Sequence, residues 1–203
     1  MRRKIIVLII CLLTLVFFSG LVHAGPATDR IRDMLEKVMS IQTDPQLQGP
    51  EQREQRRTAT KAVIAANFDL EDMAKNALDQ SWSKLTGPQR LEFKSIFQDL
   101  FLDSYTRLVL DFLKKEEIHY TKEELNQGRA LVKTTIVRAS DEIQVEYWVA
   151  SVKREWLVQD VKIDGVSIVE KYRKSFARVI TQESYEALLQ KMRTQQKATG
   201  SSS

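Results

Sequence analysis

The hydrophobic pattern is widest between Leu91 and Leu113. Thirteen of these twenty-three residues are apolar or aromatic, and no glycine or proline interrupts them. Wound at about 100° per residue, they cover more than half the circumference of an α-helix. A helix of this kind is enclosed on more than one side, while its seven charged or amide residues argue against a membrane span. The sequence therefore predicts a long central helix inside a wide apolar interior.

Three shorter helices are predicted before this one. The first covers Asp29–Gln42 with Thr28 as its N-cap, because a threonine side chain can accept a hydrogen bond from a free backbone N–H of the first turn. The second covers Glu51–Asn67, after a loop that contains two prolines. The third begins at Asp69 as N-cap and runs to about Trp82. Thr86-Gly87-Pro88-Gln89 then has the spacing of a capping box and opens the long helix.

The period of the pattern changes from helical to two near Glu117. Four strands are predicted, over residues 117–121, 130–137, 142–152 and 155–163, with the polar stretch 122–128 outside them. Ser167 and Glu170 have the spacing of another capping box, which starts a helix, and a last helix is predicted from about Gln182 to Arg193.

This order of elements predicts the α+β fold class. We expect a helical N-terminal half with one long central helix, a four-stranded antiparallel curved sheet and two C-terminal helices. A curved sheet backed by helices leaves an apolar pocket between the sheet and the helices. Residues 25–193 are predicted to form a single domain, and residues 194–203 a disordered polar tail.

The first 24 residues are predicted to be a signal peptide. Arg2, Arg3 and Lys4 form its basic start, and an apolar run of fourteen residues follows. Val22 and Ala24 then occupy the −3 and −1 positions of a cleavage site. Fourteen residues are short for a bilayer span, so we expect a periplasmic protein cleaved near Ala24, with an uncleaved anchor as the alternative.

The composition excludes several kinds of site. Three of the 31 cationic residues and none of the 27 acidic ones lie in the signal, so the mature chain has a net charge near +1 and no basis for nucleic-acid binding. Apart from Cys11 and His23 in the signal, the chain has no cysteine and only one histidine, His119. Disulfides and Cys/His zinc clusters are thereby excluded, and we expect no metal and no catalytic residue.

Two other functions remain open at this stage. His119 with Asp160, Asp164 and Glu170 is the acid/base set that a small periplasmic hydrolase or isomerase on a cone-shaped α+β fold would need. His119 falls on the polar side of its strand, Asp164 in a turn and Glu170 in a helix cap, so we expect a protein that is not an enzyme. A chaperone or adaptor for apolar protein segments is the third possibility, and it would show an exposed groove or edge strand.

Two stretches carry a resemblance to a known family. One is Trp156–Phe176, which begins Trp-Leu-Val-Gln-Asp-Val-Lys-Ile-Asp-Gly-Val-Ser. The other is Phe68–Leu78, which is followed by the spaced aromatic, leucine and glutamine positions of residues 82–97. In this order and separation they resemble the MlaC family, the toluene-tolerance auxiliary proteins, and with the signal the resemblance covers essentially the whole chain.

The resemblance implies a periplasmic carrier whose apolar pocket holds the acyl chains of a phospholipid. It implies two partner complexes, an inner-membrane ABC transporter with an MCE-domain protein and an outer-membrane lipoprotein–porin complex. Shuttling lipid between them would maintain outer-membrane lipid asymmetry. It also implies a monomer with phospholipid as cargo and no cofactor. A hopanoid-linked branch has similar motifs, so a hopanoid or another lipid stays open as the cargo.

The candidate lipid-binding residues are apolar residues on the long helix, the strands and the segment after the sheet. Each of them has the alternative of being ordinary core. They are Phe97, Leu100, Phe101, Tyr105, Val109, Val132, Ile136, Val145, Tyr147, Val149, Val161, Ile163, Val166, Tyr172 and Phe176. For the phosphate of a head group, the backbone amides at Ser167 and the cations Arg173, Lys133 and Arg138 are equal candidates.

Overall fold

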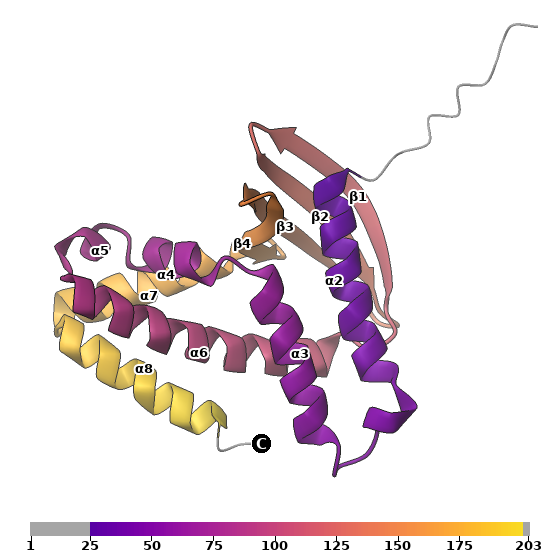
Figure 1. The fold of residues 1–203 in the computed structure, drawn as a ribbon, viewed down its shortest axis with the longest axis horizontal. Helices are drawn as coiled ribbons and strands as arrows, with labels where there is room; N and C mark the ends of the chain where they lie inside the picture. The colour runs from indigo at the N-terminus through magenta and orange to yellow at the C-terminus, as the bar shows by residue number, and fades with distance from the viewer. Residues whose placement is uncertain (1–24, 201–203) are drawn as a thin grey trace, which may run out of the picture.

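The computed structural model describes residues 25–200, so the predicted signal peptide and residues 201–203 lie outside the described part. Helices precede the sheet and two helices follow it, which confirms the α+β fold class (Figure 1). The elements are α2 (Pro26–Thr43), η1 (Pro45–Leu47), α3 (Arg53–Asn67), α4 (Leu70–Leu78), α5 (Gln80–Lys84), α6 (Gly87–Phe112), β1 (Glu117–Asn126), β2 (Arg129–Val137), β3 (Glu142–Val152), β4 (Glu155–Ile163), β5 (Val166–Ser167), α7 (Ile168–Gln182) and α8 (Tyr185–Gly200).

Local caps fix the starts of α4 and α6 as predicted. The Gln89 side chain accepts a hydrogen bond from the Thr86 backbone N–H at 2.9 Å, and Thr86 Oγ1 accepts from the Gln89 N–H at 3.4 Å. Asp69 Oδ1 accepts from the Asp72 N–H at 3.1 Å. In both places the side chain satisfies a backbone N–H that has no partner within the helix.

The predicted cap at Thr28 is wrong. Helix α2 already begins at Pro26, whose fixed φ suits the first helical position, and Thr28 lies inside the helix. The first turn is capped from outside the helix, because Glu123 Oε2 on β1 accepts from the Thr28 N–H at 2.7 Å and from Thr28 Oγ1 at 2.6 Å. A carboxylate at the positive end of a helix is favourable, so Glu123 attaches the start of α2 to the sheet.

The helix predicted from Asp69 to Trp82 is two helices, α4 and α5. Asp79 separates them with a φ of 50°, in the left-handed region, and its N–H donates to Lys75 O at 3.0 Å. A positive φ is uncommon for any residue other than glycine. The apolar spacing continues across the break, which explains why the pattern did not reveal it.

The sheet is antiparallel in the order β1-β2-β3-β4-β5, with five strands where four were predicted. The added strand, β5, is two residues long and pairs with the end of β4. Strand β1 also runs to Asn126 through the segment predicted to be outside the sheet. It lies at the sheet edge, where charged side chains are common and prevent further strand pairing.

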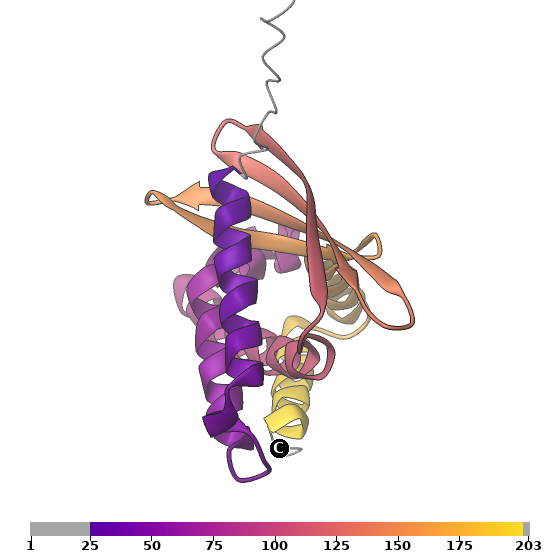
Figure 2. The same cartoon turned by 90° about the vertical axis from the view of Figure 1, so that its right-hand side faces the viewer.

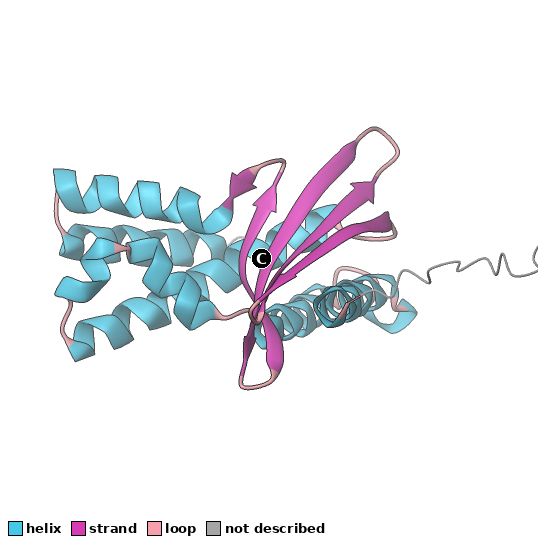
Figure 3. Ribbon diagram, turned by 90° about the horizontal axis from the view of Figure 1, so that it is seen from above, coloured by secondary structure: helices cyan, strands magenta, loops and turns pink. Residues whose placement is uncertain are grey.

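The helices form two groups beside the sheet. One consists of α4, α6, α7 and α8, and the other of α2 and α3. Helices α4, α6, α7 and α8 run side by side, with α6 in contact with both α4 and α8 (Figure 1). Helix α2 crosses the strands of the sheet and contacts β1, β2 and β4 (Figure 2). Seen from above, the helical group extends away from the sheet, while α2 lies against it (Figure 3). The interior is therefore bounded by α6, α2, α3 and the sheet.

A row of four rings on α6 forms much of the core. Phe93, Phe97, Phe101 and Tyr105, here called the aromatic column, repeat every four residues and so lie on one face. Successive ring centroids are 6.0, 6.1 and 4.5 Å apart. Phe176 of α7 meets Phe93 edge-on at 5.8 Å, an arrangement that aromatic rings favour. The column thus joins α6 to α7.

The predicted N-cap at Ser167 is confirmed, but only half of the capping box forms. Ser167 Oγ accepts from the Glu170 N–H at 3.0 Å and donates to Asp160 Oδ2 at 2.5 Å. The Glu170 side chain instead pairs with Lys174 at 2.8 Å. Helix α8 continues to Gly200, beyond the predicted end at Arg193, and so includes most of the segment predicted as a disordered tail.

Candidate functional site

An apolar cavity of about 250 Å³ lies between α2, α3, α6 and the concave side of the sheet. Its lining consists of aliphatic, methionine and aromatic side chains, with the two tyrosine hydroxyls as the polar groups. The lining residues are Met34, Leu35, Val38, Ile64, Phe68, Phe101, Tyr105, Leu108, Val109, Phe112, Leu113, Ile136, Ile143, Val145, Tyr147, Val161, Ile163 and Ile168.

Eight of the fifteen candidate lipid-binding residues border this cavity. They come from α6 and from strands β2, β3 and β4, whose register sets Val145 opposite Ile163 and Tyr147 opposite Val161. The eight are Phe101, Tyr105, Val109, Ile136, Val145, Tyr147, Val161 and Ile163. Their contact with a lipid stays a prediction.

The other seven candidates do not border the cavity. Phe97, Leu100, Val132, Val149 and Phe176 are buried in the core. Tyr172 and Phe176 pack against the aromatic column, and the ring centroids of Tyr172 and Phe97 are 5.3 Å apart. These two side chains therefore fill the part of the interior next to the cavity. Val166 is 60% exposed; it directly follows the turn at Asp164 and Gly165 that joins β4 to β5. Apolar periodicity identified the interior but could not separate its filled part from its hollow part.

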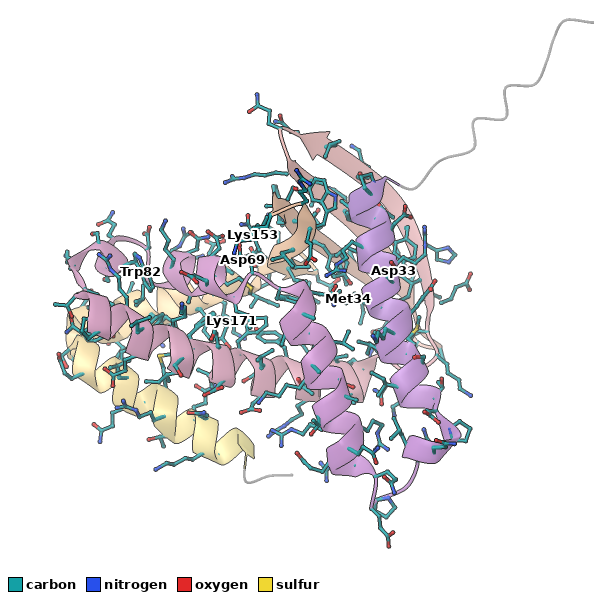
Figure 4. All side chains as sticks on the ribbon, viewed as in Figure 1. Asp33, Met34, Asp69, Trp82, Lys153 and Lys171 are labelled. Carbon is teal, nitrogen blue, oxygen red and sulfur yellow. The ribbon has the colours of Figure 1, made fainter. Side chains whose placement is uncertain are left out.

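Sequence reasoning missed the contribution of α2. Met34, Leu35 and Val38 lie on its buried face and cover one side of the cavity; Met34 is labelled in Figure 4. This face is visible in the sequence as a helical repeat of apolar residues, but nothing in the repeat says that it faces a cavity. Phe68 was also missed. Its backbone forms an isolated parallel bridge with Val158 of β4, which holds the α3–α4 connection against the sheet.

The polar groups in the cavity are neutral. Burial is the main cause that raises the pKa of Tyr105 and of Tyr147 well above the ordinary range. Both phenols therefore keep their protons at physiological pH, and Tyr147 has the Thr134 hydroxyl as a partner. Such groups can hydrogen-bond to an ester oxygen, but they supply neither a base nor a nucleophile.

The acid/base set considered from the sequence is not assembled as a site. Asp160 accepts hydrogen bonds from Ser167 and from the Val169 N–H, at the start of α7. Asp164 Oδ1 accepts from the Gln144 N–H at 3.0 Å. His119 is about half exposed on β1, with Nε2 3.4 Å from Glu117. Asp160 and Asp164 are thus used in separate local hydrogen bonds, and His119 is paired with neither.

Residues 25–200 contain no cluster of three or more histidine, cysteine, aspartate or glutamate side chains suited to a metal ion. Over the same range, no helix combines the length and apolarity that a membrane crossing requires.

Comparisons with known proteins agree with this architecture. The family model described as MlaC protein matches residues 32–194, which is well over half of the chain. Among solved structures, a phospholipid-binding protein from Ralstonia solanacearum, determined in complex with a phospholipid, has a TM-score of 0.75 and 20% sequence identity. The match covers 87% of this chain and 99% of that one, and at this identity it shows a shared fold. A search of curated proteins finds no match.

Proposed function

This chain belongs to the MlaC family, and on that premise we propose that it is a periplasmic phospholipid carrier that holds acyl chains in the apolar cavity. The observation that carries the proposal is the cavity itself, which is lined by hydrocarbon and aromatic side chains. Transfer of an acyl methylene from water into such surroundings is favourable by about 0.8 kcal/mol. The solved relative in complex with a phospholipid supports the same choice of ligand.

Loading a lipid requires the cavity to widen. Its volume of about 250 Å³ lies below the range of roughly 300–1,000 Å³ that is common for ligand sites. Helix α2 is the part of the lining best suited to move. Polar contacts hold both its ends, whereas the middle of the helix lines the cavity with apolar side chains only. Glu123 holds the first turn, and Gln42 Nε2 near the other end donates to Leu110 O and Leu113 O at 2.9 and 3.0 Å. We therefore expect α2 to bow away from the sheet when acyl chains enter.

The finer assignments are part of the same proposal. The carrier would exchange lipid with an inner-membrane ABC transporter complex containing an MCE-domain protein and with an outer-membrane lipoprotein–porin complex, and would so maintain outer-membrane lipid asymmetry. Export would depend on residues 1–24, removed near Ala24. The intact mass of protein recovered from the periplasm tests the cleavage, since a mass that includes residues 1–24 would contradict it.

Mass spectrometry of lipids extracted from the protein, purified from its own periplasm without detergent, tests the function. We expect phospholipid close to one molecule per chain. Detection of a hopanoid instead of a phospholipid would identify the alternative cargo that the family resemblance left open. Lipid-free protein that also fails to take up phospholipid from vesicles would overturn the carrier proposal, and release of lyso-lipid or free fatty acid would indicate an enzyme.

A further inference from the structure

A second cavity, of about 810 Å³, lies at the C-terminal end of α6, beside the start of α3 and the end of β2. We call it the cationic cavity, because its lining contains seven cationic and three acidic residues. The cations come from four separate segments: Arg53, Arg56 and Arg57 in α3, Arg107 in α6, Lys114 and Lys115 after α6, and Arg138 after β2.

This positive charge is not explained by helix stability. Arg53, Arg56 and Arg57 lie in the first two turns of α3, the positive end of its dipole, where cations are disfavoured. Arg57 has carboxylate partners, with Asp103 at 3.0 Å and Glu54 at 3.7 Å, and Arg56 donates to Leu47 O.

Arg138 is paired with Asp141, whereas three other cations of the cavity have no such compensation. For Arg53, Lys114 and Lys115, no ion pair forms within the part of the chain that the structure describes. A cavity with this excess of positive charge attracts an anion.

The cationic cavity adjoins the apolar cavity where α6 ends. Leu113 lines the apolar cavity and the next residue, Lys114, lines the cationic one. The Arg138 guanidinium lies 5.5 Å from the centroid of the Phe112 ring, so one contact joins the two linings. Phe112 is also 48% exposed, which makes this end the place where the apolar lining reaches solvent.

The end of α6 would otherwise repel an anion, because free carbonyl groups carry the negative end of a helix dipole. Gln42, which lines the cationic cavity, donates its side-chain amide to two of these carbonyls, Leu110 O and Leu113 O. Lys114 and Lys115 follow directly in the chain. Two carbonyl groups at the negative helix end are thus already hydrogen-bonded at the boundary between the two cavities.

We propose that the cationic cavity binds the phosphate of the same lipid whose acyl chains occupy the apolar cavity. The inference rests on the proposed carrier function and specifies its ligand as a lipid with an anionic head group. In a phospholipid the phosphate is joined to the glycerol that carries both chains, so a phosphate site must lie beside the point where the chains emerge. The cationic cavity has this position, and the guanidinium group of Arg53 with the ammonium groups of Lys114 and Lys115 suits phosphate oxygens.

A pair of lipids with identical acyl chains, phosphatidic acid and diacylglycerol, tests the proposal, since the two differ only in the phosphate. Affinities are measured by displacement of a fluorescent fatty acid. The test variant is Arg53→Gln/Lys114→Gln/Lys115→Gln, three exposed side chains outside the apolar cavity. The matched control is Arg178→Gln/Lys171→Gln/Lys75→Gln, which removes the same charge elsewhere; Lys171 on α7 is labelled in Figure 4.

We expect wild-type protein to prefer phosphatidic acid about tenfold, the size that three exposed ion pairs give together. The preference should fall to about twofold in the test variant, remain in the control, and weaken in wild-type protein as salt is added. Diacylglycerol affinity should be equal in all three proteins, which shows that the variants are folded.

Four results would overturn the assignment. An unchanged preference in the test variant, with both lipids still bound, would remove the phosphate site and leave the carrier function intact. An unchanged preference for phosphatidic acid, together with loss of lipid delivery from the test variant to a membrane complex, would identify the cavity as a docking surface for an acidic protein. Calorimetric binding of inorganic phosphate alone, with no preference between the lipids, would assign the cavity to free phosphate. Failure of wild-type protein to bind either lipid would instead overturn the carrier function itself.

Discussion

Replacing Val145 by phenylalanine measures whether acyl chains occupy the apolar cavity. Val145 of β3 is 5% exposed and borders the cavity opposite Ile163. The change adds four carbon atoms to the cavity, which displace about as many acyl methylenes. At about 0.8 kcal/mol for each methylene, affinity should fall by about 3 kcal/mol, or roughly 150-fold. The assay is titration with a fluorescent phospholipid, supported by the amount of lipid that co-purifies.

The protein itself should tolerate Val145→Phe. Added carbons in a filled core destabilise by roughly 1–3 kcal/mol, whereas here the ring enters free volume, so the melting temperature should stay the same or rise. Val166→Phe is the control, because the same change is made at a residue that is 60% exposed and away from the cavity. Wild-type affinity in a folded Val145→Phe protein would refute the reasoning. An equal loss in both variants would show that the effect does not come from the cavity.

Three further predictions concern stability. Glu123→Ala should lower the free energy of unfolding by about 1 kcal/mol in urea titrations, because it removes the cap of α2, while Glu124→Ala on the exposed side of β1 should have little effect. Asp103→Ala should cost about 2 kcal/mol, since it removes the hydrogen bonds of the buried carboxylate to Arg57 and Lys61, whose side chains are partly exposed; a loss below about 1 kcal/mol in the same titration would contradict this value. Burial raises the pKa of Tyr172 to about 12, and unfolded tyrosine ionises near pH 10, so stability should be full below about pH 10 and fall as the pH rises above it. Tyrosinate absorbance followed together with thermal melts checks this, and ionisation near pH 10 in the folded protein would contradict it.

The elements of the fold were predictable where a local signal fixed them. The Thr86–Gln89 capping box, the Asp69 cap and the Ser167 cap each depend on residues close in sequence, and all three are present. The start of α2 was not predictable, because its cap is Glu123, 95 residues away from Thr28. The charged end of β1 also lacked a signal, since an edge strand needs no apolar alternation.

The candidate site was predictable only in part, because an apolar side chain in a filled core and one at a cavity wall give the same periodic pattern. Phe97 and Phe101 lie one helical turn apart on α6, and only Phe101 borders the cavity. The difference is that Tyr172 and Phe176 of α7 fill the space beside Phe97. The sequence does not state which helix packs against which turn of α6, so the boundary between core and cavity required the structure.

The carboxylate that caps α2 also constrains residue 25. A Cβ atom at Gly25 would lie 1.9 Å from Glu123 Oε1, so any side chain there would displace the carboxylate from the Thr28 N–H. If the precursor is cut after Ala24, as the sequence predicts, the peptide nitrogen of Gly25 becomes an ammonium group close to that carboxylate. Maturation would then place a cation at the positive end of α2, where a cation is disfavoured, and the Glu123 carboxylate lies where it can compensate that charge with an ion pair.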